Sequence, residues 1–439
     1  MTAPRIVVKG ATLALSRRTN CRKAFLAPWH PQVEACWLYA LADGQRKHRV
    51  AVHHGVRVVS HHHLSVTLEQ PNLGAFLRDF HHDTSRSLNT LLARERYDAP
   101  GDLFDGRPTH VMRLLDPSSQ AQHLVYEHLN PVAAGLVSRP QQMPGRVLEF
   151  GHWKSGGLVV KRPEVYFGNE RPSELWLELT PPPLLYEAFD GDLEGLVQHM
   201  GQLSKEGGRA LREARTRPPL GAQRLRRMHP WQEPRTLAAA VGQVVPSFKV
   251  GSRDRRGQET RALAALETTG FRLQHAEARQ RFREGEHGVL FPHGTYEMRV
   301  AFDAKVAEPD AEAIVCQPGP LLSEVKAALE ARAPAREARE QRKRQQREMF
   351  AALGEAWKEE AESLSEAVDL DFARGDSERS ERGERAPSES RAVRPQPEER
   401  HVSDRDPPSK ATPHARRLII KRDRRRGRPS GRWSQAPPD

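Results

Sequence analysis

The chain has 439 residues, a formal net charge of +12 and a pI near 9.9. This length allows two or three domains, but 37% hydrophobic residues, 29% charged residues and 34 prolines indicate that a substantial part never packs into a core. The positive charge favours a polyanionic partner, either nucleic acid or an anionic membrane surface. No stretch approaches the roughly 20 apolar residues that span a bilayer, and the N-terminus lacks the apolar region of a signal peptide. We therefore expect a cytoplasmic or nucleoid-associated protein that does not enter a membrane.

The first 150 residues show the alternating strand and helix patterns of a compact α+β domain. Strands are expected where apolar residues alternate and helices where they recur every three or four residues. A helix starting at Asp116, Pro117 and Ser118 is expected to end near Asn130, because Pro131 follows. The predicted order is strand 12–18, helix 31–42, strands 49–59 and 61–68, helix 73–94, strand 109–114 and helix 117–130. This order favours a sheet with helices packed on it.

The remainder of the chain is predicted to be mostly helical and then disordered. After a connector, residues 151–183, we expect a smaller and mostly helical accessory domain over residues 184–302. Residues 303–368 are expected to form a charged helical segment, because the chain between Ser323 and Val368 is rich in Ala, Glu, Arg and Gln, which indicates an exposed charged helix. From residue 369 to 439 a Ser, Glu, Arg and Pro bias predicts a disordered basic tail.

The three cysteines, Cys21, Cys36 and Cys316, are too scattered for a zinc cluster and too few for a disulfide framework. We expect buried thiols at these positions.

The most informative segment is VVSHHHLSVTL, which contains three successive histidines. In a strand, His61, His63, Ser65 and Thr67 would face one side, and the largely apolar alternate residues would pack on a helix on the other side. His61 and His63 would lie roughly 6 to 7 Å apart along the strand, close enough to reach one cation. Since the chain has 20 histidines, a chance cluster is the alternative interpretation.

A second segment, SSQAQHLVYEHLNPVAAGLV, places Tyr126 and Asn130 on one helical face, four residues apart. A tyrosine hydroxyl can act as a covalent nucleophile, and an asparagine carbonyl can bind a hard cation. The alternative for Tyr126 alone is a residue that packs the helix on the sheet.

Together these segments resemble the single-tyrosine HUH transposases, and especially the REP-associated tyrosine transposases of the insertion-sequence-200-like group. The resemblance rests on SHHHL, then SRSLNTLLARERY, then YEHLNPVAAGLV, in the family's order and spacing, and it covers about residues 7–150. FGHWKSGG and VLFPHGTYEMR further resemble downstream parts of a longer subgroup. Ser60, His62 and Val59 depart from the family's usual residues, and a buried His62 would need a polar partner.

The resemblance implies an antiparallel-rich, ferredoxin-like sheet of the HUH endonuclease type. His61 and His63 match its metal-binding pair, Asn130 its third ligand, and Tyr126 the nucleophile that becomes linked to a 5′ phosphate. The implied metal is Mg²⁺ or Mn²⁺, and the implied substrate is single-stranded or hairpin DNA. Members often act as dimers, although this sequence contains no dimer interface that we can identify. Candidate DNA contacts are Arg17, Arg18, Arg22, Lys23, Arg86 and Arg94, each of which could equally be an ordinary solvated charge.

Two alternatives stay open at the sequence level. One is a domesticated, non-catalytic nucleic-acid-binding protein that keeps the fold and binds through the arginines between Arg416 and Arg432. The other is association with a membrane surface through IIKRDRRR, which is less favoured because the accompanying apolar patch is short.

Overall fold

The computed structural model describes residues 4–145, 147–233, 246–310 and 316–379, except for the side chains of 350 and 352–379. The chain divides after Phe350 into two compact units. The predicted tail beyond residue 379, with its basic Arg416 to Arg432 segment, lies outside the described residues. No described helix is both long and apolar enough to cross a membrane.

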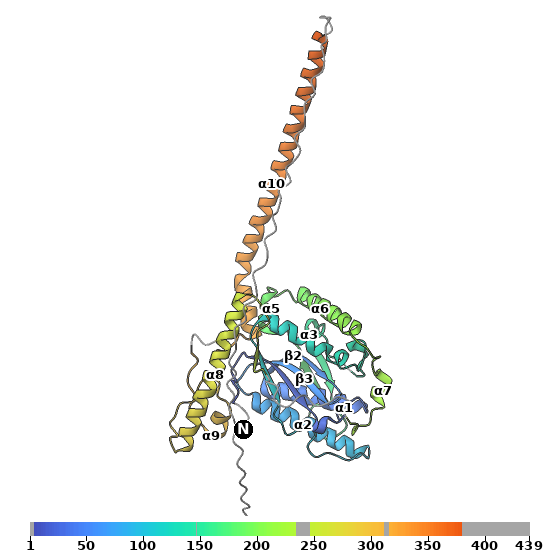
Figure 1. The fold of residues 1–439 in the computed structure, drawn as a ribbon, viewed down its shortest axis with the longest axis vertical. Coiled ribbons are helices and arrows are strands. Elements are labelled where there is room, and N and C mark those ends of the chain that lie inside the picture. Colours follow the sequence, from blue (N-terminus) through green and yellow to red (C-terminus); the bar gives the residue numbers. More distant parts are fainter. Residues whose placement is uncertain (1–3, 146, 234–245, 311–315, 380–439) are drawn as a thin grey trace, which may run out of the picture. The chain divides into compact units, whose positions relative to one another are not determined.

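A five-stranded sheet organises the described part of the first unit, in the order β2-β3-β1-β4-β7 (Figure 1). β1 pairs antiparallel with β3 and β4, β2 pairs antiparallel with β3, and the short β7 lies parallel to β4. The strands are β1 (Thr12–Arg18), β2 (Val50–Arg57), β3 (His61–Leu68), β4 (His110–Leu114) and β7 (Phe248–Lys249). The predicted antiparallel-rich sheet with helices packed on it is therefore confirmed.

Helices cover both faces of this sheet. They are α1 (Pro31–His48) and α2 (Leu73–Arg94) on one face and α3 (Pro117–Ala133) on the other. Trp37 of α1 and Phe80 of α2 both pack on the His62 ring, whereas Glu127 of α3 bonds to Ser65. Because neighbouring residues of a strand point to opposite faces, β3 presents different chemistry to the two helical layers.

The end of α3 differs from the prediction. The helix does not stop at Asn130 but continues to Ala133, with Pro131 inside its last turn. A proline removes one helical hydrogen bond, yet the Ala134 N–H still donates to the Asn130 carbonyl at 2.8 Å. The turn therefore closes around the proline, and Asn130 is fixed within regular helix.

The cysteine prediction holds only in part. Cys36 is buried in α1, Cys316 is half-buried, and Cys21 is exposed. Cys21 lies in the turn η1 (Asn20–Arg22) that follows β1, with a φ of 49°. This surface turn leaves its thiol outside the core.

The segment predicted as a connector contributes to the main core. It contains α4 (His152–Ser155) and a two-stranded sheet of β5 (Gly157–Lys161) and β6 (Glu174–Glu178). Leu158 and Leu177 of this sheet belong to the same buried cluster as Trp37, and so does Leu196 of α6 (Leu193–Glu213). Burial of such side chains stabilises the fold by about 1.5–3 kcal/mol each. The packed core therefore continues across residue 150, while the predicted boundaries at 183 and 302 stay predictions.

The remaining described elements are mostly helical. They are η2 (Pro140–Gln142), α5 (Pro183–Ala188), α6 (Leu193–Glu213), α7 (Ala222–Arg226), α8 (Arg255–Arg283), α9 (Glu297–Phe302) and α10 (Leu322–Arg379). α10 begins only at Leu322, inside the segment predicted as a charged helix over residues 303–368, and it continues past the predicted end at Val368.

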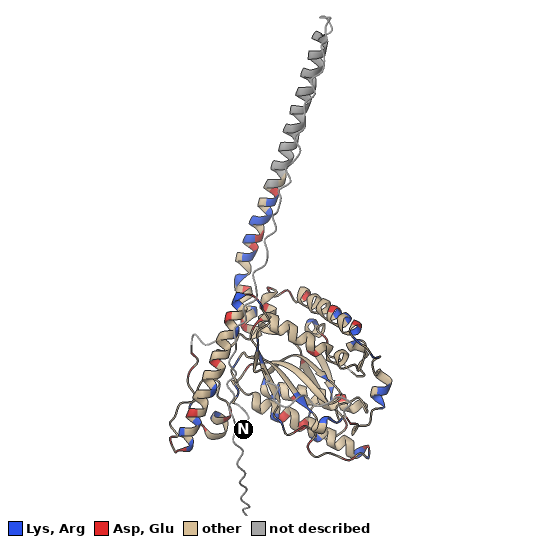
Figure 2. Ribbon diagram, in the orientation of Figure 1, with Lys and Arg blue, Asp and Glu red and all other residues tan. Residues whose placement is uncertain are grey.

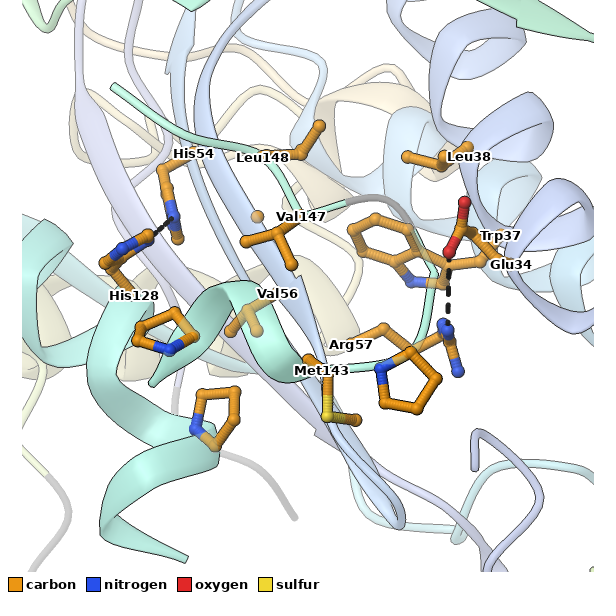
Figure 3. Close-up of a pocket in the computed structure, with 14 residues that line it drawn as sticks. Glu34, Trp37, Leu38, His54, Val56, Arg57, His128, Met143, Val147 and Leu148 are labelled. Atoms are coloured by element: carbon orange, nitrogen blue, oxygen red, sulfur yellow. Dashed lines mark hydrogen bonds and ion pairs between the residues drawn. The ribbon is translucent and has the colours of Figure 1, made fainter. Parts of the chain in front are cut away.

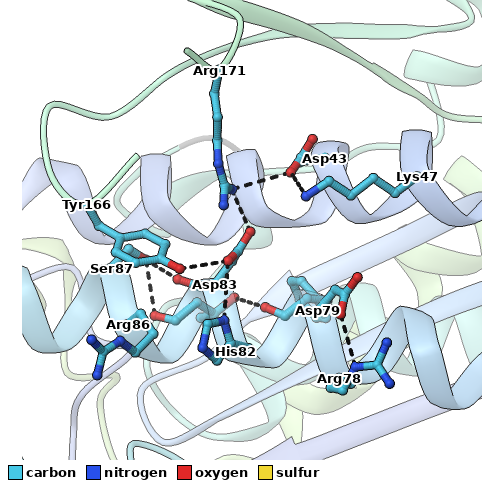
Figure 4. A network of polar contacts seen from close by, with 12 residues as sticks. Asp43, Lys47, Arg78, Asp79, His82, Asp83, Arg86, Ser87, Tyr166 and Arg171 are labelled. Atoms are coloured by element: carbon cyan, nitrogen blue, oxygen red, sulfur yellow. Dashed lines mark hydrogen bonds and ion pairs between the residues drawn. The ribbon is translucent and has the colours of Figure 1, made fainter. Parts of the chain in front are cut away.

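A buried ion network joins the loop before β6 to α1 and α2 (Figure 4). The Arg171 guanidinium lies 2.6 Å from Asp83 Oδ2 and 3.4 Å from Asp43 Oδ2. The Tyr166 hydroxyl donates to the other Asp83 oxygen at 3.0 Å. Both carboxylates are almost fully buried, so each needs these donors.

Replacing Arg171 should destabilise the protein, because the buried Asp83 carboxylate loses its cation. We expect Arg171→Ala to lower the free energy of unfolding by about 1–3 kcal/mol in urea titrations. Arg78→Ala is the matched control, because Arg78 pairs with Asp79 at the surface and should contribute less than about 1 kcal/mol. Equal losses in the two variants would contradict a role for the buried network.

Candidate active site

The two histidines predicted as metal ligands face α3. His61 and His63 lie on the same side of β3, with ring centroids 5.0 Å apart and an interplanar angle of 85°. The pairing of β1 with β3 sets Arg18 opposite His61 and Ser16 opposite His63, so both partners share this face. The predicted alternation of side chains along this strand is confirmed.

Tyr126 projects from α3 beside this pair. Its ring centroid lies 5.6 Å from that of His63, nearly perpendicular, and 5.6 Å from that of His123. The side chain remains 51% exposed. A tyrosine that only packed a helix onto the sheet would be buried, so the accessible ring argues against that alternative.

Asn130 connects both histidines. Its side-chain amide nitrogen lies 3.2 Å from His63 Nε2, and it also forms a hydrogen bond with His61. Asn130 follows Tyr126 by one helical turn, which places the two side chains on the same face of α3. The structure thus brings together the four residues that the sequence singled out, His61, His63, Tyr126 and Asn130.

Both imidazoles of the pair are neutral near pH 7. Burial lowers the pKa of His61 to about 4, an effect that the positive charges of Arg18 and Arg22 increase and the Asn130 hydrogen bond opposes. Burial, together with the neighbouring His61, lowers the pKa of His63 to about 3. Neutral imidazole is the form that binds metal ions.

The donor set fits a divalent cation. In the described part of the chain, no group of three or more His, Cys, Asp and Glu side chains is placed to hold a metal. A site here would therefore depend on the Asn130 amide as third ligand. The amide nitrogen and oxygen exchange places by a simple flip, which would turn the carbonyl oxygen toward the two imidazoles. Two imidazoles and one carbonyl, with water completing the shell, form a mixed nitrogen and oxygen donor set that suits a divalent transition-metal ion such as Mn²⁺ better than Mg²⁺, which prefers oxygen ligands.

Glu127 holds α3 in this position. Its fully buried carboxylate accepts a hydrogen bond from Ser65 Oγ at 3.0 Å and lies 3.4 Å from His54 Nδ1 and 3.2 Å from His123 Nε2. Burial alone would raise the pKa of Glu127, but the hydrogen bonds from His123 and His54 outweigh it and lower this pKa to about 2. The ionised carboxylate therefore links α3 to two strands of the sheet.

Glu127 and His123 are not among the site residues predicted from the sequence. The only available signal was their i, i+4 spacing on one helical face, next to Tyr126. The long-range partners Ser65 and His54, which show that this face is buried against the sheet, are set by the fold.

Substituting Glu127 should weaken the attachment of α3. We expect Glu127→Gln to lower the free energy of unfolding by about 1–3 kcal/mol, because an amide cannot accept from all three donors. Urea denaturation would measure the loss. Glu213→Gln, at an exposed position at the end of α6, should stay within about 0.5 kcal/mol of the parent. A Glu127→Gln protein as stable as this control would refute the anchoring role.

His62 occupies the opposite face of β3. Its ring contacts Trp37, Phe80 and Phe104, and its Nε2 lies 3.2 Å from His81 Nε2. The polar partner that a buried histidine requires is therefore His81. Burial lowers the pKa of His62 to about 3 and that of His81 well below its usual value.

These buried histidines predict acid sensitivity. Burial also lowers the pKa of His53 to about 4. Between pH 6.5 and about 4 the unfolded chain binds protons at these positions while the folded chain does not, so the free energy of unfolding should fall as the pH falls. Urea titrations at pH 7.5, 6 and 5 with EDTA would measure this decline. His62→Phe should make it shallower, and a stability that is constant from pH 7.5 to 5 would contradict the prediction.

The residues predicted to contact DNA are divided between the two faces of the five-stranded sheet. Arg18 is exposed and Arg22 half-exposed near His61, while Lys23 forms an ion pair with Glu233. The structure therefore brings the Arg18, Arg22 and Lys23 segment to the candidate site.

Three other predicted contacts lie away from it. Arg17 points to the α2 face, where its guanidinium lies over the Phe104 ring and contacts His81 and Thr109. Arg86 and Arg94 are exposed on α2, and Arg86 belongs to the surroundings of the Arg171 network. The sheet separates these three arginines from Tyr126, and their positions favour structural or solvated roles.

A separate small pocket lies around the edge strand β2 (Figure 3). Trp37, Val56, Met143 and Leu148 give it an apolar lining, and the His54 to His128 contact borders it. Neither the histidine pair nor Tyr126 lines this pocket. It therefore does not form part of the candidate site.

Comparisons with known proteins give little further information. No family model matches the chain, and no curated protein matches it either. One similar solved structure is a REP-associated tyrosine transposase bound to a REP hairpin, with 17% identity, a TM-score of 0.29, and coverage of 39% of this chain and 94% of the other. Another is described as a "putative transposase" from Deinococcus radiodurans R1, with 14% identity, a TM-score of 0.20, and coverage of 23% and 76%.

Proposed function

We propose that this protein is a metal-dependent transposase-type enzyme that cuts and rejoins single-stranded or hairpin DNA through Tyr126. The observation that carries the proposal is an accessible tyrosine ring in contact with His63, one helical turn from an asparagine that bonds both histidines. The motif resemblance of residues 7–150 supports the same residues in the same roles. A nucleophile beside a candidate cation site is the arrangement that phosphodiester cleavage requires.

In the proposed reaction, the Tyr126 hydroxyl oxygen attacks a DNA phosphorus atom. The new bond joins the tyrosine oxygen to phosphorus, and the bond from phosphorus to the 3′ oxygen breaks. The tyrosine hydroxyl gives its proton to solvent, and the departing 3′ oxygen takes a proton from solvent to become a hydroxyl. A cation held by His61, His63 and Asn130 would stabilise the negative charge on the phosphate and the departing oxygen. Because the covalent link keeps the phosphoester, attack by a 3′ hydroxyl reverses the step and rejoins a strand.

The exposed position of Tyr126 also bears on the substrate. In a regular duplex the backbone is held by its partner strand, whereas a single strand or hairpin end can bend a phosphate into a site between β3 and α3. This supports single-stranded or hairpin DNA as the substrate class.

The test is covalent capture of a DNA fragment. With Mn²⁺, a DNA hairpin labelled at its 3′ end should migrate with the protein on a denaturing gel, while a 5′-labelled strand should be released with a free 3′ hydroxyl. Tyr126→Phe should reduce the adduct to background, because it removes the attacking oxygen. Tyr186→Phe, a half-buried tyrosine of α5, is the matched control and should react normally. An adduct that survives Tyr126→Phe would show that the nucleophile is another residue.

The same assay separates the catalytic proposal from the non-catalytic alternative. EDTA, or His63→Ala, should abolish the adduct while DNA binding persists. If the parent protein bound hairpins with a steep salt dependence but never formed an adduct with Mg²⁺ or Mn²⁺, a nucleic-acid-binding protein that retains the fold would be the better description.

A further inference from the structure

Residues 215–233, here called the basic strap, run past the candidate site on a path that the sequence did not reveal. At one end, the Leu220 and Gly221 N–H groups donate to the carbonyls of Gly135 and Leu136, both at 2.9 Å. Arg215 Nη2 also donates to the Val132 carbonyl at 2.7 Å. These bonds fix the start of the strap to the chain that leaves α3.

The other end of the strap is fixed beyond α2. Trp231 Nε1 donates to the Asp98 carbonyl at 2.8 Å, and its ring packs edge-on against Phe25, with centroids 5.0 Å apart. The His229 ring packs against Tyr97 at the same centroid distance. The strap is therefore held at both ends by residues of the first 150.

Between these ends, α7 packs against the segments that carry the candidate site. Leu225 is fully buried in a cluster that includes Leu129 and Ala24, with Val125 and Val59 packed at its edge. Leu129 precedes Asn130, Val125 precedes Tyr126, and Val59 lies two residues before His61. Leu225 of α7 therefore shares a hydrophobic cluster with residues that lie next to Asn130 and Tyr126 and near His61 in the sequence.

The outward side of α7 carries only positive charge. Arg224, Arg226 and Arg227 are exposed, and within the described part of the chain none of them forms an ion pair. The ribbon of α7 carries the blue of Lys and Arg in Figure 2. Arg18 is likewise exposed on the β1 side of the candidate site. Clustered arginines that lack acidic partners repel one another, and a polyphosphate ligand would relieve this repulsion.

We propose that the basic strap binds the sugar-phosphate backbone of the DNA strand whose phosphate is attacked by Tyr126. This inference rests on the proposed function for the identity of the strand. The contacts would be to phosphates, so the strap would supply affinity and position the strand without reading its sequence. The accessory half of the chain would then act as part of the DNA-binding surface of the first 150 residues.

The test compares two triple substitutions by fluorescence anisotropy. Arg224→Ala, Arg226→Ala and Arg227→Ala are combined in a Tyr126→Phe background, so that binding of a hairpin oligonucleotide is measured without reaction. Each phosphate contact with a single strand contributes roughly 0.7 to the steepness of log affinity against log salt, so losing two to three contacts should make this slope shallower by about 1.4 to 2.1. We expect the dissociation constant at 100 mM NaCl to rise at least about tenfold.

The matched control removes the same charge from α8, through Arg256→Ala, Arg272→Ala and Arg283→Ala, all at exposed positions. An equal loss in this control would show a general charge effect and overturn the proposal, as would unchanged binding by the strap variant. Thermal melting checks that both variants fold as the parent does.

The binding result for the strap variant and the result of the covalent adduct assay can be told apart. If the parent protein forms no covalent adduct but the strap variant still loses binding, the proposed reaction fails and the strap proposal stands. If the adduct forms and the strap variant binds as the parent does, the strap proposal fails and the reaction stands. In the reactive background, raising the DNA concentration should restore adduct formation in the strap variant, because Tyr126 is unchanged.

Discussion

The buried carboxylate of Glu127 is the constraint on which the candidate site depends. It reaches from α3 to Ser65 on β3 and to His54 on β2, and a charge at this depth is tolerated only with all of these donors in place. Sliding α3 by one turn along the sheet would leave the charge without partners. The register of α3 against β3 is therefore fixed, and with it the contact between Tyr126 and His63.

The same strand serves two different environments because its side chains alternate. On the α3 face, His61 and His63 meet an amide and a tyrosine, and their neutral rings have lone pairs available for a cation. On the α2 face, His62 lies among aromatic rings, and its Nε2 contacts another buried histidine, His81. Three successive histidines thus divide into two candidate ligands and one structural residue, for reasons of geometry alone.

Segments beyond residue 150 complete this arrangement. The sheet of β5 and β6 belongs to the main core, and Arg171 ties the loop between these strands to α1 and α2. The basic strap closes over the other side, against the end of α3. Residues beyond the motif-bearing segment thus support α1 and α2 and supply the exposed arginines of α7.

The sequence by itself determined the strands and helices, because alternation and helical spacing depend on neighbours within a few residues. For the same reason the two motif segments were enough to single out His61, His63, Tyr126 and Asn130 as residues of one site. Only the tertiary structure decided that Glu127 is an anchor, that Arg18 faces the site while Arg17 faces away, and that Leu225 of α7 shares a cluster with Leu129 of α3. Those facts depend on which faces meet across a hundred residues of chain, and the spacing of residues along one segment carries no information about them.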